Sequence, residues 1–139
     1  MAIKRFIADK DTTITNAYDT YRRETGVSSS MGAADSLQVF SISGSVTTPR
    51  DNELSRVLLQ FPIDDISDLI TNGEIPTGSI VHGPQYFLKM YNVKHDQQTP
   101  RQFHLVVKPI TTYWEEGNGL DMFNYSDKDS ANWANATDT

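Results

Sequence analysis

The clearest pattern in the sequence is an alternation of apolar and polar residues over positions 55–63. Every second residue from Val57 onward is apolar, and Arg56 and Gln60 occupy the other face. A two-residue period is typical of a strand with one buried face, and Leu58, which breaks the alternation, indicates partial cover on the second face. Because a strand needs neighbours for its backbone groups, we expect a sheet protein organised around this segment.

Four further segments have the composition of strands: residues 6–14, 37–42, 85–93 and 103–110. The first is rich in β-branched residues toward its end, and the last two repeat the alternation across a connection of hairpin length. The polar segment 16–35 predicts a long loop instead. A loop of this length in a compact domain is usually functional or held by a partner.

One short helix is predicted over residues 64–70. Asp64 and Asp65 supply capping residues, and Asn72-Gly73 supplies a stop signal. Strands separated by long polar connections, with a single helix in an insertion, favour an all-β protein. We predict an antiparallel β-sandwich of the jelly-roll kind that forms one domain over residues 1–139, and a barrel is the close alternative.

Composition and charge exclude several classes of function. The 12 basic and 18 acidic residues give a net charge of -6, which opposes a general role in binding nucleic acid. The chain has no cysteine, so neither a disulfide framework nor a thiolate zinc site is possible. No apolar run resembles a signal peptide or approaches the roughly 20 residues of a membrane span. We therefore expect a protein made in a cytoplasm, with no membrane partner.

Five short segments then suggest a family. They are residues 8–14, Met31-Gly32 with Ser36 to Val39, residues 55–61, residues 87–91 and residues 112–117. In this order they resemble the DNRLRE-type β-sandwich domain, a jelly roll related to a carbohydrate-binding module family. Such domains are found in secreted multidomain proteins and in virion proteins of tailed phages. The resemblance, together with the missing signal peptide and cysteine, implies a virion protein made in the host cytoplasm.

The sequence departs from this family in two places. The connection over residues 64–83 is lengthened by the helical insertion, whereas the family's connection is usually short. Members also continue past the Asn132-Trp133 region into at least one more strand, and this chain ends at Thr139. We therefore expect a sheet that is one strand short, with an edge or apolar face that another subunit covers.

The turn Trp114-Glu115-Glu116-Gly117 has two interpretations. It could form a sugar-binding corner, with an aromatic platform beside paired carboxylates. Alternatively, Trp114 covers the open end of the sandwich, Gly117 and Gly119 supply turn conformations, and one glutamate pairs with a cation such as Arg56. We favour the second interpretation, because burial of an indole is strongly stabilising.

Neither a metal site nor an active site is predicted with a known motif. A calcium site is left open by the carboxylates Asp121, Asp127 and Asp129 near Asn132, although no EF-hand pattern is present and a solvated acidic loop is the simpler interpretation. The histidines show no metal-ligand spacing; they are His82, His95 and His104. Adjacent glutamates on a strand point to opposite faces, which opposes a glycosidase. We expect neither a cofactor nor an enzyme.

These observations predict a non-enzymatic structural protein that docks on other virion proteins or on copies of itself, as a capsid-decorating, neck or tail component. Its working surfaces are then the N-terminal arm, the 16–35 loop and the C-terminal aromatic tail. The predicted interface anchors are Tyr18, Tyr21, Trp114, Phe123, Tyr125 and Trp133. The alternative is a carbohydrate-binding module that uses exposed aromatics near Trp114 on a host-surface glycan.

Overall fold

The computed structural model describes residues 3–19, 24–25, 30–42, 53–75, 85–96, 100–120 and 130–137, with the backbone alone for residues 18–19 and 24–25. The chain divides into two compact units. The first comprises residues 1–7 and 62–107, and the second comprises residues 8–61 and 108–139. The second unit contains the described strands, and the first contains the described helix.

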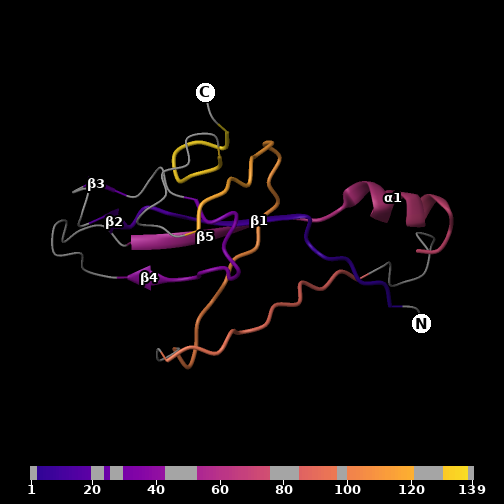
Figure 1. The fold of residues 1–139 in the computed structure, drawn as a ribbon. Helices are drawn as coiled ribbons and strands as arrows, with labels where there is room; N and C mark the ends of the chain where they lie inside the picture. The colour runs from indigo at the N-terminus through magenta and orange to yellow at the C-terminus, as the bar shows by residue number, and fades with distance from the viewer. Residues whose placement is uncertain are drawn as a thin grey trace. The chain divides into compact units, whose positions relative to one another are not determined.

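The second unit is built on a three-stranded antiparallel sheet in the order β1-β5-β4 (Figure 1). Its strands are β1 (Lys10–Thr15), β5 (Glu53–Gln60) and β4 (Ser41–Ile42). β5 therefore has a partner on each edge, which confirms the predicted central strand. It ends before Pro62, which has no N–H to continue a ladder. The described part of the protein is thus β-rich, as expected, although these strands form one small sheet and not a sandwich.

β1 is buried on both of its faces. Thr12, Thr13, Ile14 and Thr15 are all buried, although successive residues point to opposite sides of the sheet. Ile14 lies opposite Arg56 in the register, and Thr12 lies opposite Leu58, so these four residues share one face. That face is covered by later parts of the chain, which agrees with the second-face cover that Leu58 indicated.

The hydroxyls of β1 bind segments that follow it in the sequence. The Met31 N–H donates to Thr12 Oγ1 at 3.2 Å, and the Gln38 N–H donates to Thr13 Oγ1 at 3.0 Å. Thr15 Oγ1 accepts from the Ala17 N–H at 2.9 Å and donates to the Leu54 carbonyl at 2.8 Å. Threonine side chains therefore satisfy backbone groups that a sheet ladder would otherwise have to satisfy.

We expect Thr15→Val to lower the free energy of unfolding by about 1–2 kcal/mol, because valine keeps the shape but leaves the Ala17 N–H without its acceptor. Urea denaturation followed by circular dichroism measures the loss. Ser41→Ala, in the exposed strand β4, is the control and should change stability by less than about 0.5 kcal/mol. Equal effects of the two substitutions would show that the Thr15 hydroxyl has no stabilising role.

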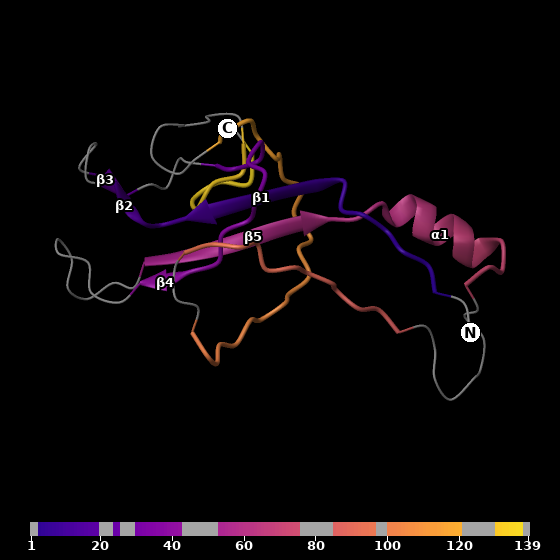
Figure 2. The ribbon, with the colours of Figure 1, turned by 60° about the horizontal axis from the view of Figure 1, so that its bottom comes forward.

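The long polar segment 16–35 is tied back to the sheet. It contains a two-stranded ribbon of β2 (Tyr18–Asp19) and β3 (Glu24–Thr25), and an isolated bridge joins Ile14 to Ser30. Its described residues thus include short strands, where the sequence predicted a loop. Figure 2 shows this ribbon beyond the end of β1.

The strand predicted over residues 37–42 is wrong for most of its length, since only Ser41–Ile42 forms a strand. Ahead of it, the Phe40 N–H donates to the Ser55 hydroxyl oxygen at 2.8 Å, and the Phe40 carbonyl accepts from the Ser55 N–H at 3.1 Å. Side-chain acceptors on β1 and β5 therefore replace part of the regular ladder here. The composition of the segment gave no indication of this substitution.

The strands predicted over residues 85–93 and 103–110 are also wrong, as is the hairpin between them. The described residues of both segments form no strand. Large apolar side chains in them face solvent; Phe87 is 82% exposed and Val107 is 79% exposed. An alternating pattern specifies which side chains favour burial, but a strand forms only where a neighbour pairs its backbone. Within the part of the chain that the structure describes, no segment pairs with residues 85–93 or 103–110.

The predicted helix is confirmed as α1 (Ile63–Thr71) in the first unit. Asp64 and Asp65 lie in its first turn and not at the N-cap, which is Pro62; their charge there favours the helix dipole. The helix ends at Thr71 with Asn72 as its C-cap, and the next residue, Gly73, has a φ of 74°, the left-handed conformation typical of the position after a helix. No helix in the described part of the chain has the length and apolar composition needed to cross a membrane.

Candidate binding site on the face of the sheet

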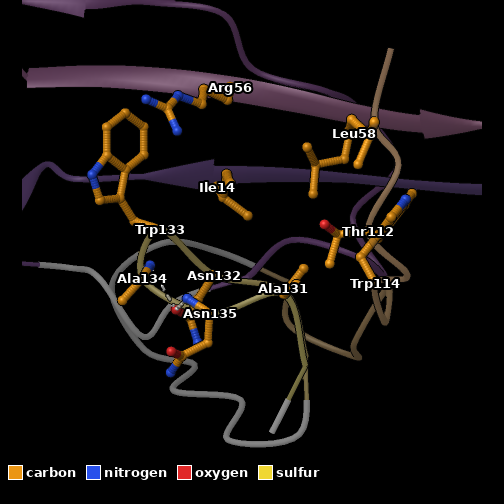
Figure 3. Close-up of a pocket in the computed structure, with 12 residues that line it drawn as sticks. Ile14, Arg56, Leu58, Thr112, Trp114, Ala131, Asn132, Trp133, Ala134 and Asn135 are labelled. Atoms are coloured by element: carbon orange, nitrogen blue, oxygen red, sulfur yellow. Dashed lines mark hydrogen bonds between the residues drawn. The ribbon is translucent and has the colours of Figure 1, made fainter.

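A pocket of about 220 Å³ lies in the second unit on the face that carries Ile14, Arg56 and Leu58 (Figure 3). Its other walls come from residues 110–114 and from the C-terminal segment 131–136. Segments far apart in the sequence therefore meet at this face. The pocket combines apolar walls with one cationic side chain.

Trp114 forms a buried part of this pocket. Its side chain is only 5% exposed, and it lies near Leu58 and Thr112 (Figure 3). The burial of Trp114 agrees with the interpretation in which this residue packs over one end of the sheet. As the indole is already enclosed by its own chain, it has little surface left for stacking on a sugar. Its predicted role as an interface anchor stays a prediction.

Arg56 and Trp133 form the polar end of the pocket. The Arg56 guanidinium carbon lies 4.0 Å from the centroid of the Trp133 ring, which is cation–π distance. Figure 3 shows the guanidinium, which comes from β5, facing the indole, which comes from the C-terminal segment. Arg56 is exposed and Trp133 is half-buried, so this pair is accessible from solvent.

Trp133 is held in place by a tight turn. The side-chain oxygen of Asn132 accepts hydrogen bonds from the Ala134 and Asn135 N–H groups, both at 2.9 Å, and the Asn132 N–H donates to the Asn135 carbonyl at 2.8 Å. Such Asn-centred turns are recognisable from sequence, because Asn side chains bond the backbone two residues on. The aromatic residue was predicted from the sequence as an anchor, whereas this turn was not predicted.

Hydrogen bonds join this turn to the backbone of Glu115. The Ala131 N–H donates to the Glu115 carbonyl at 2.7 Å, and the Glu115 N–H donates to the Ala136 carbonyl at 3.1 Å. These two bonds bring the end of the chain back beside Trp114. The two tryptophans therefore belong to one site, although 18 residues lie between them in the sequence. These intervening residues form a polar, acidic segment.

The glutamates beside Trp114 bind the start of β1. Glu115 pairs with Lys10 at 3.7 Å and accepts a hydrogen bond from the Tyr113 hydroxyl. Glu116 Oε1 accepts from the Asp11 N–H at 2.6 Å. A cation does pair with this acidic turn, as expected, but it is Lys10; the suggested partner Arg56 stacks on Trp133 instead.

Two glycines allow the turn to approach residues 30–32 closely. A β-carbon on Gly32 would overlap the Glu116 carbonyl, and one on Gly119 would overlap the Ser30 carbonyl. Gly117 has a φ of 79°, so it supplies the expected turn conformation. Gly119 has a different role from the one predicted, because close backbone contact and not a left-handed turn requires it.

The remaining predicted site residues are only partly placed. Tyr18 lies in β2, where the structure describes the backbone alone. Several predicted residues lie outside the described residues: Tyr21, Asp121, Phe123, Tyr125, Asp127 and Asp129. Within the described ranges, no group of three or more acidic or histidine side chains is placed to hold a metal ion. The calcium site at Asp121, Asp127 and Asp129 therefore stays a prediction from the sequence.

Of the two adjacent aromatic residues Tyr113 and Trp114, only Tyr113 is exposed enough to stack on a sugar. It is 63% exposed, and the Lys10 ammonium lies 4.9 Å from its ring centroid. The carbohydrate-binding alternative therefore depends on Tyr113 and not on Trp114.

Comparisons with family models, with curated proteins and with solved structures found no match to this chain. The resemblance to the DNRLRE-type domain therefore stays a prediction from the sequence.

Proposed function

We propose that this chain is a non-enzymatic structural protein of a tailed-phage particle, which acts by docking on other virion proteins or on copies of itself. The assignment to a particle comes from the sequence resemblance. The docking role is supported by one observation, which is the exposure of apolar side chains along residues 85–107.

These side chains are large, apolar and accessible. In the first unit they are Tyr86, Phe87, Leu88, Met90, Tyr91, Val93, Phe103, Leu105, Val106 and Val107. Scattered apolar residues on a surface need no explanation, but a concentration of them in two neighbouring stretches of sequence is typical of a surface that a partner covers. Burial of each such side chain contributes roughly 1.5–3 kcal/mol, so docking would be strongly favoured.

The same proposal accounts for the predicted jelly-roll sandwich. Residues 85–93 and 103–110 keep the alternation of strands but have no strand partner among the described residues. We propose that they pair with backbone groups of a neighbouring subunit, as strand addition does in other assemblies, and that the jelly-roll sandwich forms in the assembly.

The test is the mass of the purified protein in solution by light scattering, together with binding of a hydrophobic dye. We expect a defined oligomer, or a monomer that binds the dye and orders when particle proteins are added. Replacing Phe87, Val106 and Val107 together by serine should weaken association or dye binding at least tenfold, since roughly 1.4 kcal/mol is enough for that factor.

Ile63→Ser is the matched control, because it removes an exposed apolar side chain from α1, outside the two segments. It should leave association and dye binding nearly unchanged. A wild-type monomer that binds no dye would contradict the docking role. Glycan-array binding that is lost in Tyr113→Ala would then favour the carbohydrate-binding alternative.

A further inference from the structure

Among the described residues, the Arg56 guanidinium has a stacking partner but no anionic partner. Within the described residues, its recorded interaction is the stack on Trp133, and no carboxylate lies within ion-pair distance. Two lysines of the same chain do have carboxylate partners: Lys4 pairs with Glu74 at 2.5 Å, and Lys10 pairs with Glu115 at 3.7 Å. The N–H groups along the edge of a stacked guanidinium stay available for a planar acceptor.

The stack also fixes where this guanidinium lies. Trp133 is held by the Asn132 turn, and that turn is held by Glu115. Arg56 itself extends from β5, the strand with partners on both edges. An arginine that is oriented before binding loses less side-chain entropy when it accepts a ligand, so its hydrogen bonds contribute more to affinity.

The pocket next to this cation is small and mostly apolar. Ile14, Leu58, Trp114 and Ala131 line it, and its volume is about 220 Å³. Pockets for small-molecule ligands and cofactors usually hold roughly 300–1,000 Å³, so this one fits a side chain better than a cofactor. Its apolar walls favour an apolar group of a ligand, whereas Arg56 at its edge favours an anionic group.

From this geometry we propose that the Arg56–Trp133 pair and the adjoining pocket bind a segment of a docking partner in which an Asp or Glu side chain lies next to a large apolar residue. The carboxylate accepts two hydrogen bonds from Arg56, and the apolar side chain enters the pocket beside Trp114. One guanidinium balances the single charge of a carboxylate, whereas it would leave the second charge of a phosphate without a partner in this pocket. This inference rests on the proposed docking function and names the chemistry of the partner.

The test uses the full chain and a dipeptide probe, acetyl-Asp-Leu-amide. The chain has two tryptophans, so two indole N–H signals are expected in an NMR spectrum, and Trp133→Phe identifies them. We expect the probe to shift the Trp133 signal with a Kd in the millimolar range. Acetyl-Asn-Leu-amide, which lacks the charge, should bind about tenfold more weakly, as should Arg56→Gln with the original probe.

Lys89→Gln is the matched control. The Lys89 ammonium lies 4.9 Å from the Tyr91 ring, so this substitution also removes a positive charge from a cation–π pair, but in the first unit. It should leave probe binding unchanged. Arg56→Lys keeps the charge and should bind weakly, because lysine lacks the planar fork. Retained tryptophan signals in each variant show that the fold is intact.

Three results would overturn the inference: equal binding of the Asn probe, unchanged binding in Arg56→Gln, or displacement of the probe by inorganic phosphate at a similar concentration. If the probe does not bind while light scattering shows an assembly that depends on residues 85–107, the inference fails and the docking function stands. A dye-free monomer that still binds the probe through Arg56 would count against the docking function and would support the ligand chemistry.

Discussion

Replacing Gly119 by alanine is expected to lower the free energy of unfolding by about 3 kcal/mol or more. The new β-carbon would overlap the carbonyl oxygen and carbon of Ser30, and the Ser30 hydroxyl lies close by as well. Side chains can rotate away from such an overlap, but backbone atoms cannot move without disturbing the hydrogen bond from the Ala33 N–H to the Gly119 carbonyl, at 3.0 Å. Urea denaturation followed by circular dichroism measures the effect.

Gly73→Ala is the control for this substitution. Gly73 has a φ of 74° and no atom within 4 Å of the added β-carbon, so alanine there meets conformational strain without an overlap. Its cost should be about 1 kcal/mol. Gly32→Ala, which overlaps the Glu116 carbonyl, should resemble Gly119→Ala. If all three variants lost the same stability, close backbone contact would not be the reason for glycine at position 119.

Trp114→Ala is expected to cost about 3–5 kcal/mol, since it removes a large buried side chain and leaves a cavity where the pocket wall stood. The loss should appear in urea denaturation, and the remaining tryptophan, Trp133, should report the change by fluorescence. Tyr113→Ala removes the neighbouring aromatic ring, which is exposed, and should cost no more than about 1 kcal/mol.

A Trp114→Ala protein that is as stable as Tyr113→Ala would contradict the packing described for this indole. It would also support the alternative in which Trp114 is a platform for a sugar, because a tryptophan that contributes little to stability in this position must be accessible. A large loss for Trp114→Ala alone would assign the two adjacent aromatic residues to separate roles, one in packing and one on the surface.

The central strand was predictable because its pattern and its neighbours agree. β5 has alternating residues and a partner on each edge, so local preference and tertiary context lead to the same structure. α1 was predictable for a similar reason, since its ends are marked by the first-turn aspartates and by Gly73. Residues 85–93 carry an equally clear alternation, yet the pattern contains no information on whether a partner strand is present.

The site was predictable only in part. Burial of Trp114 followed from the chemistry of its side chain, and a cation beside the acidic turn followed from charge. The identity of that cation did not, because Lys10 and Arg56 are both far from residue 115 in the sequence and only the register of β1 and β5 places them. The Arg56–Trp133 stack has the same origin, since a contact between distant segments leaves no local signal.

The buried threonines of β1 have a consequence for strand pairing. A slip of one residue between β1 and β5 would move every side chain to the opposite face of the sheet. Thr12 and Thr13 would then turn their hydroxyls away from the N–H groups of Met31 and Gln38 and leave these donors without acceptors. The Thr15 hydroxyl would also lose the Leu54 carbonyl on β5 as its acceptor. A purely apolar strand could tolerate such a slip with modest loss, but this strand cannot. β1 thus excludes alternative alignments of the sheet through the polar groups of its buried threonines.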